Sequence, residues 1–135
     1  LADDSGLVIP ILGGDPGILS ARWALEPDGK RSNFTKAIRK IKHAIKKAGV
    51  APEGQKASLV CALSLCWPDG IVVSFEGVIQ GSLAFPPRGN KGFGYDPIFI
   101  PENRKLTFSE MDQIEKHQIS HRSNAFKKFI EHCFN

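Results

Sequence analysis

Two neighbouring aspartates near the start of the sequence are the first residues that could do chemistry. Asp3 and Asp4 are followed directly by Ser5 and Gly6. Carboxylate oxygens are the ligands that Mg²⁺ prefers, and one carboxylate can activate water while the other supports its loop. Ser5 adds a hydroxyl group for a phosphate or ribose oxygen, and Gly6 allows close backbone approach. An Asx-type turn without a catalytic role is the alternative, and this motif alone leaves both interpretations open.

A second motif, residues 89–97, combines glycines, two aromatic rings and an acid. It lacks the Gly-Lys-Ser/Thr ending of a P-loop, and its glycine spacing differs from that of a dinucleotide fingerprint. A ring such as Phe93 or Tyr95 beside flexible backbone can form a stacking surface for a base, and Asp96 can accept hydrogen bonds from that base. The alternative is a structural loop anchored by its aromatic side chains.

A third motif gathers hydrogen-bond donors near the C-terminal end of the sequence. Lys116, His121 and Arg122 lie within seven residues of one another. Such a cluster suits an anion or the oxo-substituted edge of a base. The spacing of His117 and His121 would suit two zinc ligands on a helix, but the sequence lacks the H-E-x-x-H pattern. The motif therefore predicts substrate binding rather than a zinc site.

Composition indicates one ordinary globular domain. The chain has 135 residues, of which 41% are hydrophobic and 24% charged, and its net charge is +4. This charge favours anionic partners but is too mild to establish nucleic-acid binding. No apolar run approaches the roughly 20 residues that span a bilayer, and no signal peptide is visible. The odd number of cysteines, without a C-x-x-C motif, predicts buried free thiols in a reducing compartment.

The elements that must position these motifs follow from hydrophobic periodicity. Residues 33–48 repeat apolar side chains at three- and four-residue steps, which predicts an amphipathic helix capped by Ser32 or Asn33 and stopped at Gly49. Its other face is strongly basic, and this face is either a solvated surface or an attractor for phosphates. The basic residues are Lys36, Arg39, Lys40, Lys42, Lys46 and Lys47.

The middle of the chain predicts a sheet, and the end of the chain a second helix. Residues 57–66 indicate a strand buried on both faces, and a turn at residues 68–70 joins it to residues 71–75 in a hairpin. Residues 77–85 continue the sheet, with glycines that suggest a bulge or strong curvature. After Thr107 the chain turns helical and ends in an amphipathic helix that Ser120 or Ser123 can cap. We expect a mixed α/β fold with a curved central sheet flanked by helices.

Together these motifs resemble the inosine triphosphate pyrophosphatase family, also called dITP/XTP pyrophosphatases. Each motif is weak alone, but their shared order and spacing across almost the whole chain are specific. The matching segments are residues 2–7, 12–17, 20–22, 75–77, 92–99, 107–111, 115–116 and 119–122.

The resemblance implies a role for each matching residue. Asp4 corresponds to the family's catalytic acid, a general base and metal ligand, and Asp3 is expected to contribute to the same metal site. The family fold is an elongated α/β one with a curved central sheet and a cleft between two lobes, and its members are typically cytosolic homodimers that use Mg²⁺. The expected substrate-binding residues are Ser5, Phe93, Gly94, Tyr95, Asp96, Lys116, His121 and Arg122.

One departure from the family pattern concerns the N-terminal side of the chain. Family members carry a first strand with a Thr/Ser-x-Asn-x-x-Lys phosphate loop, and further on a metal-binding Glu, before the Asp-Asp-Ser-Gly segment. The sequence has no counterpart and begins with Leu1. We therefore expect residues 1–135 to be a single but partial nucleotide pyrophosphatase domain without the N-terminal strands.

The expected reaction is hydrolysis of ITP, dITP or XTP to the monophosphate and pyrophosphate. The expected partners are the purine nucleoside triphosphate and a second copy of the chain, with neither a membrane nor nucleic acid, in the cytoplasm. Three alternatives stay open at this stage. They are a basic nucleic-acid-binding domain without catalysis, a related pyrophosphatase with another base preference, and an inactive fragment.

Overall fold

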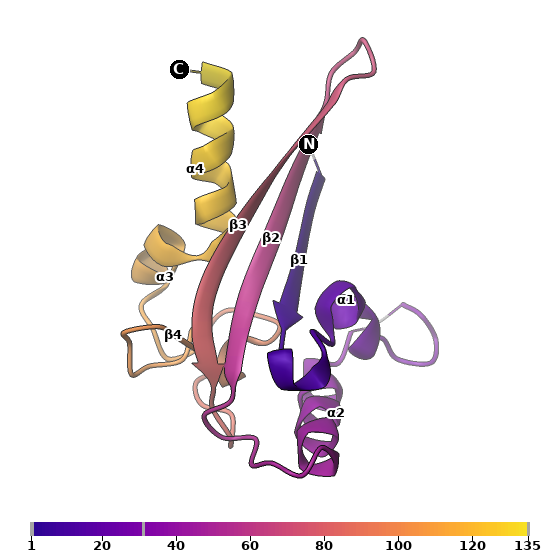
Figure 1. Cartoon of the computed structure of the whole chain (residues 1–135), viewed down its shortest axis with the longest axis vertical. Helices are drawn as coiled ribbons and strands as arrows, with labels where there is room; N and C mark the ends of the chain where they lie inside the picture. The colour runs from indigo at the N-terminus through magenta and orange to yellow at the C-terminus, as the bar shows by residue number, and fades with distance from the viewer. Residues whose placement is uncertain (1, 31, 135) are drawn as a thin grey trace.

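In the residues that the structure describes, four α-helices and four β-strands make up a mixed α/β fold, as the sequence predicts (Figure 1). The computed structural model describes residues 2–30 and 32–134. The strands are β1 (Ala2–Val8), β2 (Lys56–Cys66), β3 (Val72–Leu83) and β4 (Phe99–Pro101). The helices are α1 (Ser20–Trp23), α2 (Phe34–Lys47), α3 (Gln113–Ile119) and α4 (His121–Phe134).

The strands form one antiparallel sheet in the order β1-β2-β3-β4. Strands β2 and β3 are long and curved, and their hairpin projects beyond the rest of the sheet (Figure 1). The predicted turn joins them: the Gly70 amide donates to the Trp67 carbonyl, and the Ile71 amide donates to the Asp69 carboxylate. The segment 77–85, expected as a further stretch of sheet, belongs largely to β3 itself.

Only one face of β2 is fully buried, so the prediction of a strand buried on both faces is wrong. Its residues alternate between buried and half-buried positions from Ala57 to Ser64. On the half-buried face, their partners on β3 are exposed at Ser74, Glu76 and Val78. The half-buried face of β2 carries small residues such as Ala62, so most positions of the strand are apolar. The alternation of buried and half-buried positions is therefore not visible as an alternation of apolar and polar residues in the sequence.

The glycines of β3 serve close packing rather than a bulge. Pairing of β2 with β3 runs without interruption from Lys56–Ser82 to Cys66–Val72, which excludes the predicted bulge from this part of the sheet. A Cβ atom at Gly77 would overlap the backbone of α4 at His121 and Ala125. At Gly81 it would overlap the Ile100 carbonyl oxygen on β4. Glycine at position 77 therefore lets α4 lie directly on the sheet.

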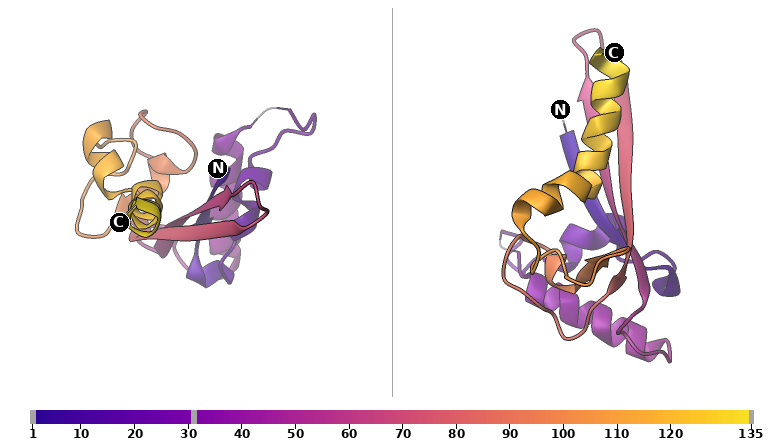
Figure 2. Two further views of the ribbon diagram at one scale, coloured as in Figure 1. Left: turned by 90° about the horizontal axis from the view of Figure 1, so that it is seen from above. Right: turned by 90° about the vertical axis from the view of Figure 1, so that its left-hand side faces the viewer.

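Helix α2 forms as its periodicity predicts. The Asn33 side chain accepts a hydrogen bond from the Lys36 amide at 3.1 Å, and Gly49 follows the helix with a positive φ of 87°. The helix lies at the opposite end of the molecule from the C-terminus (Figure 2, right). Its apolar face is buried in the main core, whereas the six basic side chains of its other face are exposed. The core residues it contributes are Ala37, Ile38, Ile41 and Ile45.

Helices α3 and α4 lie toward the β3 side of the sheet, and α1 and α2 lie toward the β1 side (Figure 2, left). Ser120 caps α4, as one of the two predicted alternatives, because its hydroxyl accepts from the Ser123 amide at 3.1 Å. Ala125 and Phe129 of the terminal helix are buried, but Phe126 is 47% exposed, so only part of the predicted apolar stripe packs on the sheet.

The three cysteines are free, as predicted, but they differ in burial. Cys61 is buried, Cys133 half-buried and Cys66, near the hairpin turn, exposed. The expectation that Cys66 is buried is therefore wrong, because the hairpin extends beyond the packed part of the sheet. In the described part of the chain, no helix is both long and apolar enough to span a membrane.

Candidate functional site

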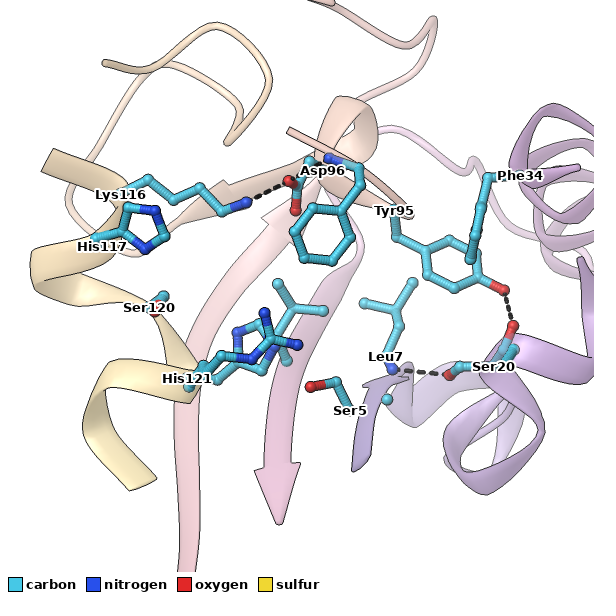
Figure 3. A pocket seen from close by; sticks show the side chains of 16 residues that line it. Ser5, Leu7, Ser20, Phe34, Tyr95, Asp96, Lys116, His117, Ser120 and His121 are labelled. Carbon is cyan, nitrogen blue, oxygen red and sulfur yellow. Dashed lines mark hydrogen bonds and ion pairs between the residues drawn. The ribbon is translucent and has the colours of Figure 1, made fainter. Parts of the chain in front are cut away.

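A cavity of about 170 Å³ lies where β1, α1, the start of α2, the loop before β4, and helices α3 and α4 converge (Figure 3). Some of these elements lie more than a hundred positions apart in the sequence, and only the fold brings them together. All the residues that the sequence predicts as substrate-binding line this cavity. They are Ser5, Phe93, Gly94, Tyr95, Asp96, Lys116, His121 and Arg122.

A buried ion pair fixes the aromatic loop of the cavity. Lys116 Nζ on α3 lies 2.5 Å from Asp96 Oδ2, and both side chains are more than nine-tenths buried. The same carboxylate oxygen accepts a hydrogen bond from the Phe93 amide at 3.0 Å. Gly92 has a φ of 73°, and a Cβ there would overlap the Asp96 carboxylate. The loop conformation therefore depends on a glycine and an acid within the loop and on a lysine 20 positions farther along the sequence.

The ring of Phe93 remains accessible at the mouth of the cavity. It is 63% exposed, although it lies in a segment held by the buried ion pair. Lys116 Nζ lies 4.6 Å from the ring centroid, and the guanidinium carbon of Arg122 lies 5.6 Å from it. An exposed aromatic ring with two cations beside it provides a surface on which a planar, electron-rich group can stack.

Tyr95 supports the opposite wall of the cavity from inside the core. Its hydroxyl donates to the Ser20 carbonyl at 2.6 Å, and its ring meets that of Phe34 edge-on at 5.1 Å. The Ser20 hydroxyl in turn accepts from the Leu7 amide and donates to the Gly17 carbonyl. Because burial raises the pKa of Tyr95 well above its usual value, this phenol stays protonated and acts as a hydrogen-bond donor.

The sequence did not identify two residues of this wall as part of the site. Phe34 reads as one more core residue of an amphipathic helix, and Ser20 reads as part of a short helical turn. The signal for Ser20 was present, because residues 20–22 match a family segment. Phe34 carried no such signal, since its place beside the cavity depends on how α2 packs against the loop that contains Tyr95.

Two buried polar atoms of the cavity wall have no hydrogen-bond partner among the residues that the structure describes: Ser5 Oγ and His121 Nδ1. His121 is only 9% exposed. Burial, reinforced by the positive charges of Arg122 and Lys116, lowers the pKa of His121 to about 4, so its imidazole is neutral near neutral pH. Since buried polar groups are normally satisfied, such atoms facing a cavity mark positions where a ligand can supply the missing partner.

The two aspartates of the first motif lie in strand β1, so the Asx-turn alternative is wrong. Successive side chains of a strand point to opposite faces. Asp3 shares the face of Ser5 and Cys61, because the Cys61 thiol donates to Asp3 Oδ1 at 3.4 Å. Asp4 points to the other face, is exposed, and lies opposite Ala62 on β2. The two carboxylates therefore do not converge on a single ion.

Asp3 is also engaged by Arg122, whose Nε lies 2.6 Å from Asp3 Oδ2. Among the described residues, no group of three or more His, Cys, Asp or Glu side chains is arranged to hold a metal ion. Of the two carboxylates of this motif, that of Asp4 has no partner among residues 2–30 and 32–134. This fits a Mg²⁺ ion that is bound by one carboxylate and otherwise by substrate phosphates and water, which is common for this ion.

Comparison with known proteins places this arrangement in a family. The model of the Ham1 family matches residues 1–132. The chain belongs to the Ham1 family. Two solved Ham1 proteins share the fold. The one from Coxiella burnetii has a TM-score of 0.82 at 38% identity, covering 95% of this chain and 63% of its own. The one from Staphylococcus aureus has a TM-score of 0.80 at 37% identity, covering 97% and 66%.

Curated relatives of this Ham1 chain are named dITP/XTP pyrophosphatase. The protein of Rhodospirillum centenum is 48% identical over 134 residues, covering 99% of this chain and 64% of its own length. That of Zymomonas mobilis is 49% identical over 133 residues, covering 98% of this chain and 61% of its own length. The chain therefore spans slightly less than two thirds of the length of these relatives.

Proposed function

We propose that the protein hydrolyses non-canonical purine nucleoside triphosphates (ITP, dITP and XTP) to the monophosphate and pyrophosphate. The observation that carries this proposal is the convergence of all eight expected substrate-binding residues on one cavity. Sequence similarity to proteins named dITP/XTP pyrophosphatase supports the same substrate class. The proposed role of this site is therefore to remove such nucleotides from the cellular pool.

The cavity suits the base rather than the whole nucleotide. Its volume of about 170 Å³ is below the roughly 300–1,000 Å³ of complete small-molecule sites. We place the purine against the exposed Phe93 ring, where stacking stabilises any base. Because Asp96 holds Lys116, the terminal amines of Arg122 are the better candidates to donate to the six-position oxygen of hypoxanthine or xanthine.

Discrimination against adenine follows from hydrogen-bond donors that would lose their acceptor. Adenine carries an amino group where hypoxanthine carries an oxygen, so Arg122 would face a donor. Each buried polar group left unmatched costs about 1–3 kcal/mol, and several together give strong selection. Ser5 Oγ and His121 Nδ1, which lack hydrogen-bond partners among the described residues, are further positions at which a correct ligand can form a hydrogen bond.

Asp4 is the residue we assign to catalysis. Strand β1 is an edge strand, so a triphosphate that leaves the cavity past Ser5 can reach Asp4 across that edge. There the Asp4 carboxylate orients the attacking water and accepts its proton. It also provides one oxygen ligand for Mg²⁺, which when bound neutralises charge on the phosphate oxygens. The products are the nucleoside monophosphate and pyrophosphate.

The remaining expectations are proposals of the same kind. We propose that residues 1–135 act as one domain, that the protein works in the cytoplasm, and that it forms a homodimer. Among the described residues, the outer edge of β1 is bonded only near its end, at Leu7 and Val8, and the rest of this edge supports association through its backbone groups. The apolar face of α2 is buried in the core, which leaves its lysines as a solvated surface and argues against membrane insertion. We therefore expect neither a membrane nor nucleic acid as a partner.

Pyrophosphate release from a panel of triphosphates tests this function. With Mg²⁺ present, ITP, dITP and XTP should be hydrolysed much faster than ATP, and chelation of the metal should abolish release. Asp4→Asn should lower kcat by a factor on the order of 10² or more. Arg122→Ala should weaken ITP turnover far more than it weakens folding. Equal rates for ITP and ATP, or normal turnover by Asp4→Asn, would contradict the assignment.

A further inference from the structure

Arg122 lies at the boundary between two cavities. Besides the cavity described above, a second one of about 400 Å³ adjoins the first. Three residues line both: His117, Ser120 and Arg122. Asp3 lines only the second, so the ion pair between Asp3 and Arg122 spans the boundary. The orientation of one guanidinium group therefore shapes both spaces.

Asp3 holds this guanidinium through a specific atom. Its Oδ2 contacts Arg122 Nε at 2.6 Å, while its other oxygen, Oδ1, accepts from the buried Cys61 thiol at 3.4 Å. Both carboxylate oxygens are thus engaged by the protein. The contact at 2.6 Å uses Nε rather than a terminal amine. The same guanidinium group lies over the ring of Phe93, with its carbon 5.6 Å from the ring centroid.

Strand β1, which carries Asp3, and helix α4, which carries Arg122, are held together through the sheet. Strand β1 pairs with β2, and β2 pairs with β3, so that Ser5, Cys61 and Gly77 form one row across the sheet. The start of α4 lies directly on Gly77, with no room for a methyl group between them. Arg122 is the second residue of α4, and Asp3 lies two residues before Ser5. The separation of the two side chains is therefore set by backbone contacts, not by loops.

We propose that Asp3 is a positioning residue for Arg122, which it orients toward the base, and not a ligand of the metal ion. This inference rests on the proposed function and assigns the two neighbouring aspartates different tasks. Asp4 serves the phosphates on one face of β1, and Asp3 serves base recognition on the other. As a metal ligand, Asp3 would have to share its two engaged oxygens with the ion, which would weaken its hold on the Arg122 charge.

A double-mutant cycle with a metal-free readout tests the inference. The variants are Asp3→Asn, Arg122→Gln and the double variant, each checked for folding by circular dichroism. Binding of inosine monophosphate (IMP) without Mg²⁺ is measured by calorimetry, and ITP hydrolysis gives KM, kcat and the Mg²⁺ requirement. Arg104→Gln is the matched control, because it breaks an exposed ion pair with Glu115 (3.4 Å) and lines neither cavity.

We expect Asp3→Asn to weaken metal-free IMP binding about threefold to tenfold, as loss of roughly 0.6–1.4 kcal/mol implies. KM for ITP should rise by a similar factor, with kcat and the Mg²⁺ requirement nearly unchanged. In the Arg122→Gln background, Asp3→Asn should have no further effect, because the residue it positions is gone. The Arg104→Gln control should bind IMP as the wild type does.

Two results would overturn the inference, and they differ from failure of the proposed function. One is a severalfold shift in the Mg²⁺ requirement of Asp3→Asn with normal metal-free IMP binding, which would make Asp3 a metal ligand. The other is an effect of Asp3→Asn that persists in full in the Arg122→Gln background. A wild-type protein that neither binds IMP nor hydrolyses ITP would instead refute the proposed function and this inference with it.

Discussion

The buried His121 predicts a specific dependence of stability on pH. Burial, with help from Arg122 and Lys116, lowers the pKa of His121 from its usual 6.5 to about 4 in the folded state. As the pH falls below 6.5, the unfolded chain takes up a proton at this residue and the folded protein does not. The free energy of unfolding therefore decreases until the pH reaches the folded pKa, and below it this contribution is constant.

The size of the effect follows from the difference between the two pKa values. Each pKa unit corresponds to about 1.4 kcal/mol, so the full loss is about 3 kcal/mol. Between about pH 7 and about pH 5, His121 of the unfolded chain takes up most of its proton. The free energy of unfolding therefore falls by about 2 kcal/mol over this range because of His121. This is a large fraction of the total stability of a small domain.

Urea unfolding at a series of pH values measures the effect. In His121→Gln, the decrease in the free energy of unfolding between about pH 7 and about pH 5 should shrink by about 2 kcal/mol relative to the wild type. The comparison uses the pH slope, so a change in absolute stability does not obscure it. His43→Gln, on the exposed face of α2, should retain the wild-type slope. Identical slopes for His121→Gln and the wild type would refute the reasoning.

Three further substitutions test the packing and the binding surface. Gly77→Ala should lower the free energy of unfolding by about 1–3 kcal/mol, because its methyl group would overlap the α4 backbone at Ala125; urea titration measures it. Asp96→Asn should cost about 3–5 kcal/mol in the same assay, because Lys116 would keep a buried charge without its partner. Phe93→Ala should barely change stability, since the ring is 63% exposed, but should weaken IMP binding by about 1–3 kcal/mol in calorimetry.

Two of these substitutions have a control variant, and the third has a refuting outcome. Gly54→Ala introduces a methyl group into open space at a positive φ of 82°, so it should cost only the backbone strain of about 1 kcal/mol. Adding Lys116→Met to Asp96→Asn should recover part of the lost stability, because no unpaired charge then remains buried. A wild-type affinity for IMP in Phe93→Ala would show that the ring is not the stacking surface.

Local patterns in the sequence predicted most of the secondary structure, and the family resemblance supplied the expected substrate-binding residues. The apolar stripe of residues 33–48 and its Asn33 cap became α2, and the turn at residues 68–70 became the tip of a hairpin. These features depend on neighbours three or four positions away, which a single sequence displays directly. The eight expected substrate-binding residues were found through motifs in register, and the structure brings them to one cavity.

Tertiary structure decided how these residues lie relative to one another. The sequence offered an Asx-type turn as one interpretation of Asp3-Asp4-Ser5, whereas pairing with β2 makes this segment a strand. That pairing sends the two carboxylates to opposite faces and places Asp3 beside Arg122. The Asp96–Lys116 pair and the contact of Gly77 with α4 are likewise invisible in sequence, because their partners lie 20 or more positions apart. Periodicity records which face of an element is apolar, whereas contacts between distant side chains exist only once the chain has folded.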